Sequence, residues 1–145
     1  MKRARAIICC VIAACEMSVA LAQAPVLIVK SAWARRAPGS DVAAVYLDLS
    51  NISPKPIIVV GVQSPMASSS MLHESSVVNG QSQMRMKNTI VIAPGKTVSF
   101  APGGTHVMLT GLKGNIGVGQ SVPLVLLLAD GSKVAVAAVV KPLVP

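Results

Sequence analysis

The histidines and the nearby methionines are the side chains with the most specific chemistry in this sequence. There are two histidines, His73 and His106, and each lies close to a methionine. Met108 follows His106 by two positions, and residues spaced by two point to the same face of a β-strand. Val107, between them, would then face the core. An imidazole and a thioether side by side form a clip that could hold a soft metal ion.

The donor types indicate which metal such a clip would take. A thioether is neutral and soft and an imidazole is borderline, so together they favour Cu(I) over Zn(II) or Mg(II). Taken singly, a histidine is more often a surface or hydrogen-bonded residue, and a methionine usually fills space in a core. The joint placement of these residues is therefore what favours metal binding.

The first two dozen residues have the pattern of an export signal. Basic residues precede an apolar run over residues 6–14, and the small-residue triplet Ala20-Leu21-Ala22 follows it. This pattern predicts a signal peptide over residues 1–22 and a mature copper-binding domain over residues 23–145.

The cysteines leave a second possibility open for the leader. All three, Cys9, Cys10 and Cys15, lie within it, and Ile12-Ala13-Ala14-Cys15 resembles a lipobox. In this alternative the leader spans residues 1–14, and a lipid on Cys15 tethers the domain to a membrane. Under cleavage before Gln23 the mature domain has no cysteine, which leaves methionine as its soft ligand and excludes a blue-copper electron carrier.

Turn-forming residues recur every eight to twelve positions, and β-branched and aliphatic runs lie between them. The predicted strands are Val26–Ala34, Val42–Leu49, Ile57–Val62, Ser70–Val78, Thr89–Ile92, Thr97–Phe100, His106–Leu109, Pro123–Leu128 and Lys133–Val140. Asp130-Gly131 predicts a hairpin between the last two. Short strands without helices indicate one all-β domain, an antiparallel β-sandwich or barrel with Greek-key connections.

Composition limits the other function classes. Hydrophobic residues make up 52% of the sequence and charged residues 12%, which is enough apolar material for a buried core. The net charge is +8, but the basic residues are dispersed and aromatic side chains that could stack on bases are few. We therefore expect no nucleic-acid partner. No nucleophile motif is present, and we expect no enzyme.

The spacing of histidine and methionine resembles a known copper signature. His73 is followed after ten residues by Met84, and after a further twenty-one by His106-x-Met108. This arrangement resembles the periplasmic copper chaperone family of the PCuAC type. Other segments that look like this family are Ser31-Ala32-Trp33-Ala34-Arg35, Ala44-Val45-Tyr46-Leu47, Leu72-His73-Glu74, Met84-Arg85 and Pro102-Gly103-Gly104-Thr105-His106-Val107-Met108-Leu109.

The resemblance implies a cupredoxin-like fold that binds Cu(I) at an exposed edge through His73, Met84, His106 and Met108. It also implies a periplasmic protein that passes copper to an acceptor, either the copper centre of a cytochrome c oxidase subunit or another copper carrier, or that serves copper tolerance. We expect a monomer that is attached to a membrane only if Cys15 is lipidated.

Two features depart from the family pattern. Met86 stands where many members have proline, and the His- and Met-rich tail that gives some members a second copper site is missing. Met86 and Met71 each lie two residues from a signature ligand, so either could be an alternative ligand, although methionines on a strand are more often packing residues.

A function without metal is the alternative hypothesis. An exported β-sandwich could contact a protein partner through an open sheet edge, by adding a strand from that partner. This hypothesis predicts no copper binding, which separates it from the first.

Overall fold

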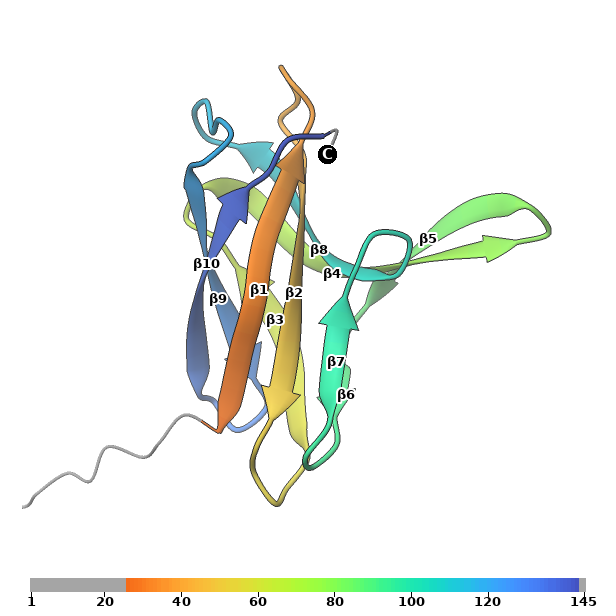
Figure 1. Ribbon diagram of the computed structural model, residues 1–145, viewed down its shortest axis with the longest axis vertical. Coiled ribbons are helices and arrows are strands. Elements are labelled where there is room, and N and C mark those ends of the chain that lie inside the picture. Colours follow the sequence, from red (N-terminus) through yellow and green to blue (C-terminus); the bar gives the residue numbers. More distant parts are fainter. Residues whose placement is uncertain (1–25, 144–145) are drawn as a thin grey trace, which may run out of the picture.

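The computed structural model describes residues 26–143, which form ten β-strands (Figure 1). The strands are β1 (Leu27–Arg36), β2 (Ala43–Asn51), β3 (Ile57–Gln63), β4 (Ala67–Val78), β5 (Gln81–Lys87), β6 (Ile90–Ile92), β7 (Thr97–Phe100), β8 (Thr105–Leu112), β9 (Ser121–Leu128) and β10 (Lys133–Val140). The expected all-β class is confirmed, and each of the nine predicted runs overlaps a strand. The tenth, β5, was not predicted. The predicted leader and its three cysteines lie outside the described residues.

The strands hydrogen-bond into one continuous sheet in the order β5-β4-β8-β2-β1-β10-β9-β3-β6, with β7 beside β2. In Figure 1, β1 and β2 lie in front of β3, so the sheet folds over itself into two layers. One pair, β1 with β10, is parallel, and the other pairs within residues 26–143 are antiparallel. In this part of the chain no helix is long and apolar enough to cross a bilayer.

Alternating aliphatic side chains decide which face of each strand is buried. In β2, Val45, Leu47 and Leu49 belong to the hydrophobic core, whereas Tyr46 and Asp48 alternate with them on the opposite face. Leu124 and Leu126 on β9 contribute to the same core. Burying a valine or leucine stabilises the fold by about 1.5–3 kcal/mol per side chain. These residues therefore hold the two layers together.

Two tight hairpins follow from turn residues that tolerate positive φ. Asp130-Gly131 joins β9 to β10, and Gly131 has a φ of 85°, so the predicted antiparallel pairing of the last two strands is confirmed. Asn79-Gly80 joins β4 to β5, with φ of 50° and 77°. Positive φ at both central residues is typical of a type I′ hairpin turn. This second hairpin projects from the body of the protein (Figure 1).

Gly111 allows β8 to lie close against β4. Its φ is +62°, in the left-handed region that residues with a Cβ rarely adopt. An added Cβ would come within 2.8 Å of the Cβ and Oγ atoms of Ser68. The Ser68 hydroxyl also donates a 3.1 Å hydrogen bond to the Gly111 carbonyl. The close approach of these two strands therefore requires glycine at this position.

We predict that Gly111→Ala lowers the free energy of unfolding by about 2–4 kcal/mol, because it combines a strained backbone with a steric clash. Gly95→Ala is the matched control, since Gly95 has a φ of +67° but an added Cβ there would meet no atom within 4 Å. The control should cost about 1–2 kcal/mol. Chemical denaturation measures both values, and equal losses would contradict a specific role for the close approach of β8 and β4.

Candidate functional site

The two histidines lie side by side on the outer face of β4 and β8. The antiparallel register places His73 opposite His106 and Leu72 opposite Val107. Leu72 and Val107 are buried, at 3% and 0% exposure, so they face the core and the histidines face away from it. Met108 lies two residues beyond His106 and therefore shares the histidine face. The predicted orientation of Val107 into the core is confirmed.

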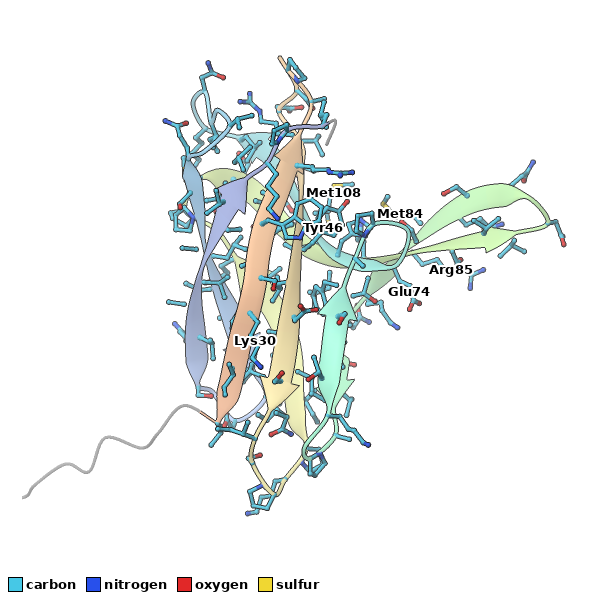
Figure 2. The ribbon with its side chains drawn as sticks, viewed as in Figure 1. Lys30, Tyr46, Glu74, Met84, Arg85 and Met108 are labelled. Atoms are coloured by element: carbon cyan, nitrogen blue, oxygen red, sulfur yellow. The ribbon has the colours of Figure 1, made fainter. Side chains whose placement is uncertain are left out.

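β5 brings the fourth predicted residue to the same face. Met84 is the cross-strand partner of Ser75, which lies two residues from His73 on β4. The Met84 Sδ atom is 3.1 Å from the His73 Nδ1 atom. Figure 2 shows Met84, Met108 and Tyr46 on one side of the strands. The four residues predicted from the sequence are thus gathered on a single surface, here called the His-Met face.

The imidazole of His106 is held firmly in place. The side chain is buried, at 4% exposure, and its ring lies 5.9 Å from that of His73, centroid to centroid, at an interplanar angle of 85°. Its Nδ1 atom is 3.0 Å from the Gly104 carbonyl, which also accepts a 3.0 Å hydrogen bond from the Ser75 amide. Donation from Nδ1 to this carbonyl leaves Nε2 with the free electron pair that a metal needs.

Two aromatic side chains form the wall beside His106. The Tyr46 ring lies 6.2 Å from the His106 ring and 4.5 Å from the Trp33 ring, centroid to centroid. Arg35 and Lys141 both lie over Trp33, each 5.1 Å from the ring centroid. Tyr46 lies on the face of β2 opposite the core. The sequence did not indicate that this face adjoins the histidines, because the pairing of β2 with β8 joins distant parts of the chain.

Glu74 belongs to the opposite face of β4. Its carboxylate forms a 3.0 Å salt bridge with Lys87 on β5, and both side chains are partly exposed. Figure 2 shows Glu74 and Arg85 on the side of the hairpin away from Met84. Glu74 is therefore a partly solvated carboxylate that points away from His73.

Two effects lower the pKa of His73 below its ordinary value of 6.5. The larger is partial burial, which disfavours the charged imidazolium, and the smaller is repulsion from His106 across the strand pair. Both effects keep His73 neutral at neutral pH. A neutral imidazole is the form that can bind a metal.

The His-Met face offers neutral donors. Between Val26 and Leu143, no three His, Cys, Asp or Glu side chains come together in a way that could hold a metal ion. The face combines two imidazoles with thioethers, a soft and borderline set that carries no charge of its own. Its chemistry suits a soft monovalent cation.

Fold and His-Met face define this chain as a cupredoxin-like β-sandwich of the PCuAC type. The copper-bound PCuAC domain from PmoF2 matches it with a TM-score of 0.67, at 24% identity, over 81% of this chain and 93% of that domain. A solution structure of CuI-DR1885 from Deinococcus radiodurans is 36% identical, with a TM-score of 0.66, over 83% of this chain and 81% of that one. The predicted resemblance and the predicted fold are confirmed.

The chain belongs to the LpqE-like family. Residues 27–140 match this family, which is described as "Putative lipoprotein LpqE-like". The "Putative lipoprotein Lxx21020" of Leifsonia xyli subsp. xyli is 41% identical over 120 residues, which is 82% of this chain and 72% of that protein. Both matches cover the part of the chain that carries the His-Met face.

We predict that His73 of the metal-free protein titrates below pH 6.5. At a pH between the folded-state pKa of His73 and 6.5, the unfolded chain binds more protons than the folded protein. The stability contributed by neutral His73 is therefore complete above pH 6.5 and is lost as the pH falls through this window. NMR of the ring protons measures the midpoint. His106→Gln should raise the pKa of His73 partway toward 6.5, because the repulsion from His106 disappears while the burial of His73 remains. A wild-type midpoint at or above 6.5 would contradict this account.

Proposed function

We propose that this protein binds one Cu(I) ion through His73, Met84, His106 and Met108 and passes it to an acceptor. The observation that carries the proposal is that the two histidine rings lie 5.9 Å apart, centroid to centroid, on an outer face of the sheet, with the Met84 thioether 3.1 Å from His73. The 36% identical CuI-DR1885, whose name records Cu(I), supports it further.

The residues on this face fit a soft cargo ion. His106 is oriented by the Gly104 carbonyl so that Nε2 is available, and Met84 already lies against the imidazole of His73. Thioethers do not titrate, and they neither form disulfides nor release protons on binding. A site of this kind stabilises the reduced ion in an oxidising compartment.

Unequal burial of the ligands suggests the order of release. Met84 is 51% exposed and lies on β5, a strand at the edge of the sheet, whereas His106 is buried. An acceptor ligand can therefore reach the ion from the β5 side and displace Met84 first, while His106 is still bound. The ion passes through a shared intermediate without a change of oxidation state.

The acceptor is a copper protein with stronger soft ligands, and the copper centre of cytochrome c oxidase is the first to test. Copper tolerance is the second role, in which the chain would carry the ion to another copper carrier. Arg35 and Lys141 beside Trp33 give the surroundings of the His-Met face a positive charge. This charge favours an acceptor with an acidic surface.

A protein-binding module without metal is the second candidate function. β5 is an edge strand, and Met84 and Met86 leave it with exposed apolar side chains. Such an edge could pair with a strand from a partner. In that case the histidines would have a structural role, and copper would not bind tightly.

We predict one tight equivalent of Cu(I) in an anaerobic titration against a chromophoric chelator. Met84→Leu and Met108→Leu should each weaken binding about tenfold or more, equivalent to about 1.4 kcal/mol, because leucine keeps the volume but removes the sulfur. His106→Gln should weaken it further, since His106 is the most firmly positioned ligand.

The matched control for these variants is Met66→Leu. Met66 packs against the core, away from the proposed ligands, so its replacement should leave Cu(I) affinity unchanged. Absence of tight binding by the wild type, or equal weakening by the control, would favour the module without metal.

We also propose that the protein is exported to the periplasm. The basic and apolar leader supports export, and the lipoprotein names of the relatives support attachment through Cys15 over cleavage before Gln23.

We predict that the protein expressed in its host fractionates with membranes, and that Cys15→Ser releases it or blocks its maturation. Mass spectrometry of the mature N-terminus separates the two cleavage sites. A soluble wild-type protein that begins at Gln23 would establish the signal peptide of residues 1–22 instead.

A further inference from the structure

Two methionines outside the proposed ligand set share the His-Met face. Met71 is the cross-strand partner of Met108, and Met86 is the cross-strand partner of His73. Cross-strand partners on one face have Cβ atoms about 4.5–5.5 Å apart, within reach of long side chains. Each of these methionines therefore lies directly across the strand pair from a proposed copper ligand.

Core packing does not explain Met86. Its side chain is 64% exposed on an edge strand, although an apolar side chain is stabilised by burial. Met71 is only partly buried. Met66 shows the contrasting situation, because it packs against the hydrophobic core. The exposed side chain of Met86 and the partly exposed side chain of Met71 can thus be reached by an ion from solvent.

Met71 and Met86 also line the same cavity. It has a volume of about 300 Å³ and lies where β3 passes the beginning of β4 and the end of β5. Gln63 and Asn88 belong to the same lining. A site of this size can accommodate an ion together with several waters, each of which occupies about 30 Å³.

We propose that Met71 and Met86 form a second, weaker site for a soft monovalent cation, next to the first. This inference rests on the proposed function, which supplies Cu(I) as the cargo. Two thioethers select Cu(I) or Ag(I) over harder ions, and without an imidazole they bind less tightly than the four-ligand site.

The second site gives the cargo an intermediate position. An ion on Met71 and Met86 can enter the first site by exchanging a thioether for His73 or Met108, which face these methionines across the strands. Only metal–ligand bonds form and break in this step. The copper remains Cu(I), and no proton is released if the incoming imidazole is neutral.

The test is an anaerobic Cu(I) titration of the purified exported protein labelled with ¹³C in the methionine methyl groups. The first equivalent should shift the Met84 and Met108 signals. The second should shift Met71 and Met86, with an affinity at least about tenfold weaker. The Met66 signal should stay in place throughout, because this residue packs against the core.

A double variant, Met71→Leu with Met86→Leu, should lose the second equivalent and keep the first within about twofold, a change of about 0.4 kcal/mol. If Met71 and Met86 do not respond while Met84 and Met108 do, the second site is wrong and the proposed function stands. A Met86 shift with the first equivalent would also overturn the division into two sites. If no methionine responds, the proposed function fails as well.

Discussion

The pairing register of β4 with β8 is the constraint on which the rest of the structure depends. Leu72 and Val107 face each other in the core, and the neighbouring His73 and His106 must then face each other outside it. A slip of one of these strands by one residue would turn its histidine toward the core and its aliphatic neighbour away from the core. Burial of Leu72 and Val107 is worth several kcal/mol together, so the hydrophobic core itself sets the alignment of the histidines. Site geometry and fold stability are therefore determined by the same interaction.

Rigidity decreases across the His-Met face from β8 to β5. His106 is buried, bonded to the Gly104 carbonyl and flanked by Tyr46. Met84 lies on a hairpin that projects from the body and is held by one neighbouring strand. Elements with few buried contacts open most readily. One side of the face is thus suited to retaining an ion and the other to releasing it, which is the combination that a carrier requires.

Local sequence patterns predicted the features that depend on interactions between residues close together in the chain. The β-branched and aliphatic runs between turn residues, together with the Asp130-Gly131 turn, identified strands and a hairpin that the structure contains. β5 was missed because its polar sequence lacks β-branched residues and is stabilised by pairing with β4. The Asn79-Gly80 turn that precedes it was a signal that could have found it. The approach of Tyr46 to His106 and the parallel pairing of β1 with β10 depend on contacts between distant segments. No local pattern specifies such contacts.

The uncharged character of the proposed ligands bears on the direction of transfer. Imidazoles and thioethers do not neutralise the charge of Cu(I), and Arg35 and Lys141 at the Trp33 ring add further positive charge nearby. An acceptor with thiolate ligands would both neutralise the ion and bind it more strongly as a soft base. Transfer to such an acceptor is then favourable without any external energy source. Transfer in the reverse direction would have to separate the ion from its compensating thiolate charge, so neutral donors would give the proposed delivery its direction.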